Sequence, residues 1–299
     1  MGLVTRRSLI AIPPALLAQE TTFRVDVRLV RMLATVRNER GEMAGSLGKE
    51  DFIVTDNGVE QEIALFEKST AQPLSIAMLV DTSRSTEREK RYEIDSMKRF
   101  LKALIAAGNP QDAAALYSFN FEVTQQSGFT RKLSRLEAGL RRLKSEGATA
   151  LYDAIYLASE SLEEREGRRV MIVVSDGGDT ISKLKFENAL EALHKANAVL
   201  YSILVVPVAG DAGRNLRGEN ALTTLSQWTG GKIFFPAVGP ALDSVFREIL
   251  SDLRTQYLLG YYPRGVPPSK DRFHRVSLKV RKPGYTVSAR NGYFSDSKG

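Results

Sequence analysis

Three short segments of the chain carry small oxygen-bearing side chains at the points where apolar strands would end. Residues 81–85 (Asp-Thr-Ser-Arg-Ser) follow the apolar run 74–80, and Asp176 follows a second apolar run, 170–175. Thr149 stands just before a helical pattern. In an open parallel sheet, the carboxyl ends of the strands form the edge at which ligands bind. Two carboxylates and three hydroxyls, without Cys or His, make a hard oxygen site that suits Mg²⁺ or Mn²⁺ rather than Zn²⁺.

The composition of the chain allows a folded protein with room for more than one domain. It has 299 residues, of which 43% are hydrophobic and 26% charged, so general disorder is excluded. The net charge is +7, but basic residues alternate with acidic ones and no nucleic-acid motif stands out, so no nucleic-acid partner is expected. The absence of Cys excludes disulfides and thiolate metal sites. The two histidines, His194 and His274, lie away from the motifs, and we expect them at the surface or in packing positions.

Residues 73–253 alternate apolar strand patterns with amphipathic helix patterns. A helix of about 86–107, for example, has apolar residues at spacings of three and four. This rhythm predicts an α/β domain with a mostly parallel sheet and helices on both faces. Trp228, the sole Trp, occupies an apolar helical position and is predicted to lie in the core.

The two ends of the chain have strand patterns instead. Residues 22–70 and 254–294 alternate apolar and polar positions, and Asp56-Asn57-Gly58 is a strong hairpin signal. Segments of roughly 40–50 residues are too small to bury a core alone. We therefore expect the two segments to join into one β-sandwich, with the α/β domain inserted between them. The alternative is a separate strand appendage at each end.

Residues 1–18 have the pattern of an export signal. Arg6 and Arg7 precede a short apolar run, residues 8–18, which is far shorter than the ~20 residues that span a membrane. The two arginines also fit a twin-arginine signal. The pattern predicts export to the periplasm or the cell surface, and the alternative is a frayed, weakly apolar N-terminus. No later segment is predicted to be transmembrane.

The set Asp81, Ser83, Ser85, Thr149 and Asp176 resembles the metal-ion-dependent adhesion site of von Willebrand factor type A domains. In that family, the pattern D-x-S-x-S is joined by a distant Thr and by an Asp on a later strand of a Rossmann-like fold. The surrounding phrases Leu-Val-Asp-Thr-Ser and Val-Ser-Asp-Gly-Gly-Asp match as well. The strand-rich ends are similar to those of a bacterial family of exported proteins, often described from acidobacteria, that carry this domain.

The resemblance implies a role for each residue of the set. Ser83 and Ser85 would bind the cation directly, and Thr149 directly or through water. Asp81 and Asp176 would hold it mainly through waters, which leaves the ion electrophilic. The cation would be Mg²⁺ or Mn²⁺ ahead of Ca²⁺. An open position would then accept an acidic side chain of a protein partner.

Two further residues have alternative interpretations. Arg84 lies between two of the predicted ligands, either facing solvent or forming a cationic rim that attracts acidic groups. Asp179 is either in the second shell of the metal or a helix N-cap.

These features favour a non-enzymatic, cation-dependent protein-binding module of the adhesion type. One alternative is an accessory or assembly subunit of a larger complex, as with type A domains in metal chelatases. A metal-assisted hydrolase lacks a candidate general base beyond the two ligand carboxylates. Only the positive charge suggests a nucleic-acid-binding protein, and such a protein would show a steep salt dependence of binding.

Overall fold

The computed structural model describes residues 29–68, 72–83, 87–145, 147–205, 215–236, 241–267 and 269–295. The predicted export signal, Arg84 and Ser85 lie outside the described residues.

A six-stranded sheet forms the centre of the larger unit, in the order β10-β9-β8-β5-β6-β7. All its strand pairs are parallel except β6 with β7, which is antiparallel. Every residue of β5 is buried, as expected where helices cover both faces of a parallel sheet. The strands are β5 (Leu74–Asp81), β6 (Ala113–Phe119), β7 (Val123–Thr130), β8 (Arg168–Ser175), β9 (Ala198–Leu204) and β10 (Ile233–Phe234).

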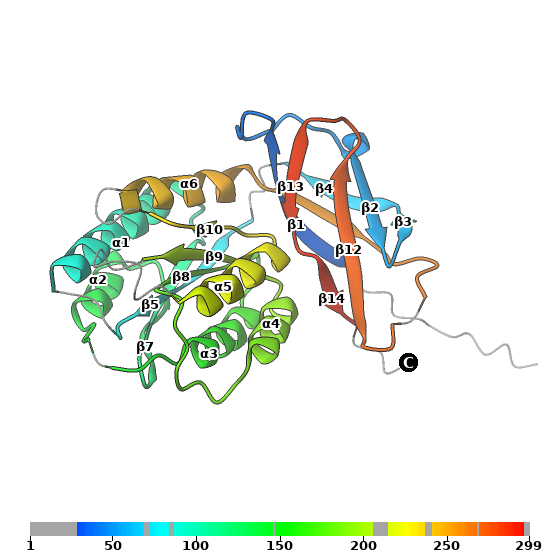
Figure 1. The fold of residues 1–299 in the computed structure, drawn as a ribbon. Coiled ribbons are helices and arrows are strands. Elements are labelled where there is room, and N and C mark those ends of the chain that lie inside the picture. Colours follow the sequence, from blue (N-terminus) through cyan, green and yellow to red (C-terminus); the bar gives the residue numbers. More distant parts are fainter. Residues whose placement is uncertain are drawn as a thin grey trace, which may run out of the picture.

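Helices cover this sheet on both faces, which confirms the predicted fold class (Figure 1). On one face lie α1 (Glu87–Ala107), α2 (Leu133–Arg141) and α6 (Ala241–Thr255), where the rings of Phe100 and Phe246 are 4.9 Å apart. On the other lie α3 (Leu151–Glu163), α4 (Phe186–Lys195) and α5 (Leu216–Trp228). The sheet therefore has an apolar core on each side.

The strand-rich ends of the chain form two four-stranded sheets, β13-β1-β11-β4 and β14-β12-β2-β3. In the first sheet, β1 from the N-terminal end pairs with β11 and β13 from the C-terminal end; in the second, β2 pairs with β12. The two sheets share one apolar core. Their strands are β1 (Val30–Asn38), β2 (Phe52–Asp56), β3 (Val59–Gln61), β4 (Ile63–Glu67), β11 (Tyr257–Tyr261), β12 (Phe273–Val280), β13 (Tyr285–Ala289) and β14 (Gly292–Phe294).

Polar contacts connect this sandwich to the α/β unit. Arg37 of β1 forms an ion pair of 2.5 Å with Asp252 of α6, whose side chain is almost fully buried. Arg168, at the start of β8, donates to the carbonyls of Gln72 and Leu253, one on each of the two chain crossings between the units. Because the first residues of β5 lie next to these crossings, the carboxyl end of the sheet points away from the sandwich (Figure 1).

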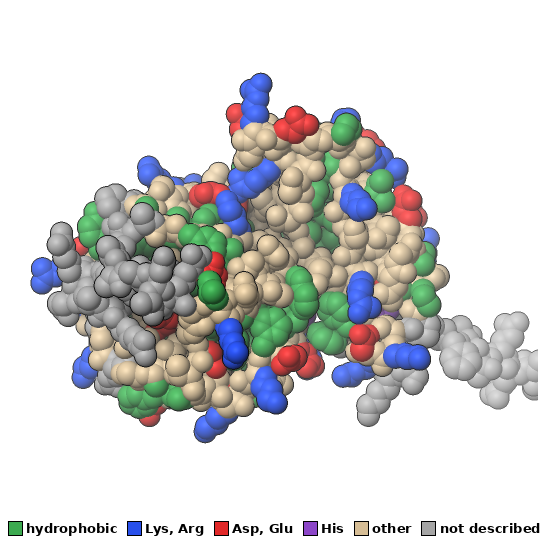
Figure 2. All heavy atoms as spheres, in the orientation of Figure 1, with side chains coloured by type: hydrophobic (Ala, Val, Ile, Leu, Met, Phe, Trp, Pro, Cys, Tyr) green, Lys and Arg blue, Asp and Glu red, His purple; other side chains and the backbone are tan. Residues whose placement is uncertain are grey.

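The surface is mixed in charge, and one predicted core residue is exposed. Figure 2 shows Lys and Arg side chains interspersed with Asp and Glu over the face in view. Trp228, predicted to lie in the core, is 41% exposed, because it is the last residue of α5. Its ring makes an edge-on contact with Phe186. Within the described residues, no helix combines the length and apolar character needed to cross a membrane.

Candidate metal site

Asp81 is the last residue of β5, which lies between β8 and β6 in the sheet. Its side chain is buried, and its two oxygens are oriented by different segments. The Ser175 hydroxyl, at the end of β8, donates to Asp81 Oδ2 at 2.6 Å, and the Ser83 amide donates to Oδ1 at 2.9 Å. Burial raises the pKa of the Asp81 carboxyl; hydrogen bonds from Ser175 and Ser83 oppose the rise, and the charge of Asp176 adds to it. The two predicted carboxylates are therefore electrostatic neighbours.

Hydrogen bonds to the end of the adjacent strand, β6, hold the loop that follows β5. The Thr82 amide donates to the carbonyl of Phe119, the last residue of β6, at 3.0 Å. Asn120 Nδ2 donates to the Thr82 hydroxyl at 3.2 Å. Ser83 follows with a buried side chain. These contacts hold the hydroxyl of Ser83 close to the carboxylate of Asp81, whose pKa the Ser83 side chain lowers through a hydrogen bond.

Thr149 is held by the loops after β6 and β8. Its carbonyl accepts from the Thr180 amide at 2.8 Å, and its own amide donates to the Thr180 hydroxyl at 2.8 Å. The next amide, that of Ala150, donates to the Asn120 carbonyl at 2.7 Å. Ala148 has a φ of 70°, a left-handed conformation that costs energy in a residue with a Cβ and is often found at functional sites. These contacts hold the main chain at Thr149 from two neighbouring loops, and the Thr149 side chain is buried.

Asp176 opens a tight turn that packs against α5. Its Oδ1 accepts from the Gly178 amide at 2.8 Å, and its side chain is half-buried. Gly177 has a φ of +85° and lies so close to Gly218 of α5 that a Cβ on Gly218 would come within 1.5 Å of the Gly177 carbonyl oxygen. Only glycine fits at either position, so the backbone fixes where Asp176 lies.

Asp179 is an N-terminal cap, although not for a helix that follows it in sequence. Its Oδ1 accepts from the amide of Leu151, the first residue of α3, at 2.9 Å and from the amide of Tyr152 at 3.4 Å. A second contact joins the same two segments, because the carboxylate of Asp153 in α3 accepts from the amides of Lys183 and Leu184. Asp179 thus acts as a cap, and its placement in the second shell of a metal stays a prediction. The cap joins the loop after β8 to the residue that directly follows the Thr149–Ala150 turn.

The structure thus gathers four of the five predicted site residues through one hydrogen-bonded set of loops. Ser85, the fifth, and Arg84 are outside the described part of the chain. The four supply two carboxylates and two hydroxyls, all hard oxygen donors. Each bonded carboxylate oxygen keeps a second lone pair, so the donor set fits a cation such as Mg²⁺. Among the described residues, no group of three or more Asp, Glu, His or Cys could hold a metal.

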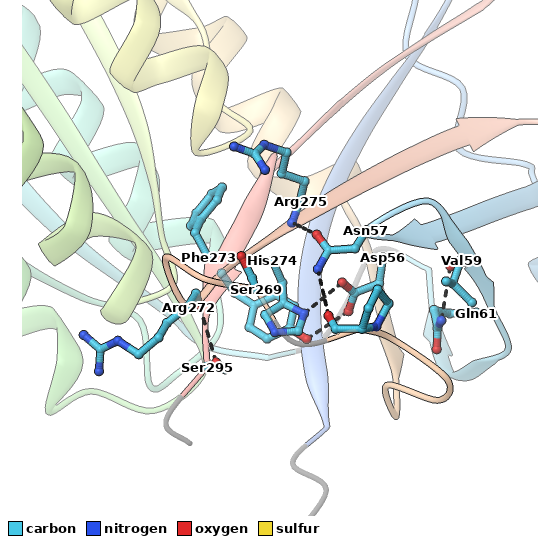
Figure 3. Close-up of polar contacts among 12 residues, drawn as sticks. Asp56, Asn57, Val59, Gln61, Ser269, Arg272, Phe273, His274, Arg275 and Ser295 are labelled. Atoms are coloured by element: carbon cyan, nitrogen blue, oxygen red, sulfur yellow. Dashed lines mark hydrogen bonds and ion pairs between the residues drawn. The ribbon is translucent and has the colours of Figure 1, made fainter. Parts of the chain in front are cut away.

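Another buried carboxylate, Asp56, lies in the sandwich and was not predicted from the sequence. It ends β2 and is fully buried. Its Oδ2 accepts from the hydroxyls of Tyr261 and Tyr293, each at 2.9 Å, and its Oδ1 lies 3.1 Å from His274 Nδ1. Figure 3 shows His274 pointing from β12 toward Asp56. The three partners come from three different strands of both sheets, so we call these four residues the Asp56 cluster.

Both histidines are packing residues, which was one of the two expectations for them. His274 stacks on Tyr293 with ring centroids 4.8 Å apart. His194, on α4, packs edge-on against Phe273 and Phe294 of the sandwich. Burial lowers the pKa of His194 to about 3, and the charge of Arg290 contributes to the decrease.

Comparison with known proteins identifies part of the chain. Residues 76–178 match the family model described as von Willebrand factor type A domain. This match spans the strands and loops that carry Asp81, Ser83, Thr149 and Asp176. No curated protein matches the chain significantly.

Solved structures of low sequence identity are also similar. An aerotolerance-related membrane protein from Bacteroides fragilis is 17% identical, with a TM-score of 0.46 over 60% of this chain and 98% of that one. The PilB minor pilin from Streptococcus sanguinis is 13% identical, with a TM-score of 0.47 over 61% of each chain. BatB from Bacteroides thetaiotaomicron, a conserved hypothetical protein, is 16% identical, with a TM-score of 0.45 over 61% of this chain and 100% of that one.

Proposed function

This chain is a von Willebrand factor type A domain protein, and from that premise we propose that it is a divalent-cation-dependent module that binds another protein. The observation that carries the proposal is the hydrogen-bonded set of loops around Asp81. These loops bring two carboxylates and two hydroxyls to the carboxyl edge of the sheet, where open α/β sheets bind ligands. Interaction with proteins is common among type A domains, and cation dependence is the finer step proposed here.

The cation would be held by Asp81, Ser83, Thr149 and Asp176, with Ser85 as the fifth ligand. We propose Mg²⁺ or Mn²⁺, because hard oxygen donors and retained waters suit these ions. When bound, such an ion supplies an electrophilic position that takes a carboxylate oxygen from an acidic residue of the partner. Asp81 and Asp176 reduce the cost of holding a dication by their charge, and Ser83 and Thr149 contribute neutral oxygens.

The attachment of the α/β unit fits a role in binding. The carboxyl edge of the sheet faces away from the sandwich, so a large partner can approach it without meeting the sandwich (Figure 1). The export signal expected in residues 1–18 favours a protein of the periplasm or the cell surface. We propose no catalytic role for this site.

A titration with Mn²⁺, followed by electron paramagnetic resonance of the free ion, tests the proposal directly. The native chain should bind about one Mn²⁺, and the Asp81→Asn, Asp176→Asn double variant should bind none at the same concentration. Asp271→Asn is the matched control, since Asp271 is an exposed carboxylate in the sandwich that also accepts a backbone amide. Equal Mn²⁺ binding by native chain and double variant would refute the proposal.

A further inference from the structure

Large apolar side chains are exposed at the edge of the sheet that carries the candidate metal site. In the whole described part of the chain, eight large apolar side chains are exposed: Tyr92, Phe121, Leu157, Ile181, Leu216, Trp228, Phe235 and Tyr262. Three of them, Phe121, Ile181 and Leu216, are each directly connected to a residue of the hydrogen-bonded loops around Asp81.

Phe121 lies at the tip of the β6–β7 hairpin and is 50% exposed. The preceding residue, Asn120, bonds to Thr82 and accepts from the Ala150 amide. The hairpin is closed on the other side, because the Glu122 amide donates to Asn120 Oδ1 at 3.0 Å. Phe121 therefore projects from a fixed turn that contacts the loops of both Asp81 and Thr149.

Ile181 and Leu216 follow β8 and β9, which lie on the other side of β5 from β6 in the sheet order. The Ile181 amide donates to the Thr149 carbonyl at 3.2 Å, and the side chain is 44% exposed. Leu216 is the first residue of α5 and is 61% exposed. The cap residue before it, Asn215, accepts from the amide of Gly218, whose backbone packs on the Asp176–Gly177 turn.

We propose that Phe121, Ile181 and Leu216 form an apolar rim that selects protein segments in which an acidic residue is flanked by large apolar residues. The inference rests on the proposed function, because the acidic residue would be the one that the cation binds. The rim side chains follow β6, β8 and β9, and β5 with Asp81 lies between β6 and β8. Removing exposed apolar surface from water on binding is favourable, which makes these side chains the natural partners of apolar flanking residues.

The spacing of the strands sets the length of the segment. From β6 to β9 there are three strand-to-strand steps of about 4.8 Å, or about 14 Å in all. An extended chain rises about 3.3 Å per residue, so four to five residues cover this distance. The acidic residue would lie near the middle, and its apolar neighbours would lie within two residues on either side.

The charges next to the rim favour a protein segment over a lipid surface. Glu122 follows Phe121, Arg217 follows Leu216, and Lys183 lies two residues after Ile181, so charges of both signs accompany the rim. Each of the three exposed apolar side chains therefore has a charged neighbour in the chain. A peptide, which offers single side chains of either charge beside apolar ones, suits such a surface better than a lipid layer does.

A peptide selection tests the proposal. A phage-displayed library of seven-residue peptides with a central Asp and random flanks would be bound to the full chain in Mg²⁺ and eluted with EDTA. We expect Leu, Ile, Phe, Met and Val to be enriched about threefold or more within two residues of the Asp. Selected peptides should bind the triple variant Phe121→Ser, Ile181→Ser, Leu216→Ser about 100-fold more weakly, or about fivefold for each side chain.

Two controls separate the rim from the metal site. The variant Leu157→Ser, Tyr262→Ser removes two exposed apolar side chains elsewhere and should leave the affinity unchanged. The triple variant should still bind Mn²⁺ like the native chain, which also shows that it is folded. Loss of peptide affinity with Mn²⁺ binding retained supports the rim.

The remaining outcomes overturn the proposal in distinguishable ways. If Asp peptides bind in Mg²⁺ without apolar enrichment, or bind the triple variant equally well, the rim is refuted and the proposed function stands. If the chain binds Mn²⁺ but no peptide is recovered, the rim is again refuted. If the chain binds no Mn²⁺, both the proposed function and the apolar rim are refuted.

Discussion

Asp56 and Asp81 are both buried aspartates at the ends of strands, and both accept hydrogen bonds from hydroxyls, yet their surroundings differ. Asp56 is fully buried and is met by two tyrosine hydroxyls and a histidine ring nitrogen from other strands. Asp81 accepts from a serine hydroxyl and a neighbouring amide, and it has a second carboxylate, Asp176, close to it. One carboxylate is satisfied by its own protein, whereas the other is placed beside a like charge.

The groups around a buried carboxylate distinguish a structural one from a functional one. A structural carboxylate is surrounded by donors, because a buried charge without them is costly. A pair of neighbouring carboxylates at an open edge of a sheet is unfavourable on its own and becomes favourable when a cation binds. We therefore expect removal of Asp56 to damage the fold and removal of Asp81 to damage only cation binding.

The largest effect is expected for Asp56→Ala. The change leaves the hydroxyls of Tyr261 and Tyr293 and the ring of His274 without their common acceptor inside the sandwich. The free energy of unfolding should fall by about 3–5 kcal/mol, as when one partner of a buried charged network is removed. Urea denaturation monitored by circular dichroism measures this change.

Tyr293→Phe provides the graded control for that experiment. It removes one of the hydroxyls that bond to Asp56 while the ring can still stack on His274, so the expected loss is about 1–2 kcal/mol. If Asp56→Ala costs less than this single hydroxyl, the Asp56 cluster does not stabilise the sandwich.

A smaller effect, dependent on pH, is expected from His194. Unlike Asp56, it has a buried ring nitrogen, Nε2, without a hydrogen-bond partner among the described residues. Its pKa is about 3 in the folded chain, against the ordinary value of 6.5 for an exposed histidine, so the unfolded chain takes up a proton first as the pH falls. Stability is therefore lost as the pH decreases through this range. From pH 7 to pH 5 the loss from this group should be about 2 kcal/mol.

Comparison with His194→Leu isolates this contribution, because other groups titrate in both proteins. The native chain should lose about 2 kcal/mol more than the variant between pH 7 and pH 5. Equal losses would mean that His194 is protonated in the folded chain, and that its packing against Phe273 and Phe294 does not exclude the charge.

The smallest effect on stability is expected for Asp81→Asn in EDTA. Asparagine can still accept from the Ser83 amide or the Ser175 hydroxyl, and the repulsion from Asp176 is removed. The free energy of unfolding should change by less than about 1 kcal/mol in either direction. A loss comparable to that of Asp56→Ala would show that Asp81 is a structural carboxylate, and the contrast between the two regions would disappear.

Local patterns in the sequence predicted the α/β fold, and the metal site at its edge stays a prediction. Runs such as 74–80 are apolar throughout because both faces of the sheet are covered, and each ends at a residue that the fold brings to one edge. Asp81 and Asp176 could therefore be placed at that edge without knowing any long-range contact, whereas Thr149 was recognised from its place before a helical pattern. The cap made by Asp179 was one of two alternatives, since its helix, α3, begins 28 residues earlier in the chain.

Contacts between distant segments could not be predicted in this way. Asp56 is more than 200 residues away from its partners Tyr261, His274 and Tyr293, and no spacing connects them. In the sequence, Asp56 was only the start of a turn. Trp228 was predicted to be buried from its helical spacing, but its exposure depends on its place at the end of α5, beside the sandwich. Burial at such a junction is decided by tertiary packing rather than by periodicity.

The central claim, that the carboxylate pair binds a cation, is tested most directly by thermal melting. The full chain would be melted in EDTA and in increasing Mg²⁺, beside the Asp81→Asn, Asp176→Asn double variant. A ligand that binds only the folded state stabilises it by about 2.7 kcal/mol at 100 times its Kd, so Tm should rise with Mg²⁺. We predict this rise for the native chain and its absence in the double variant. An equal rise in both proteins, or none in either, would contradict the claim.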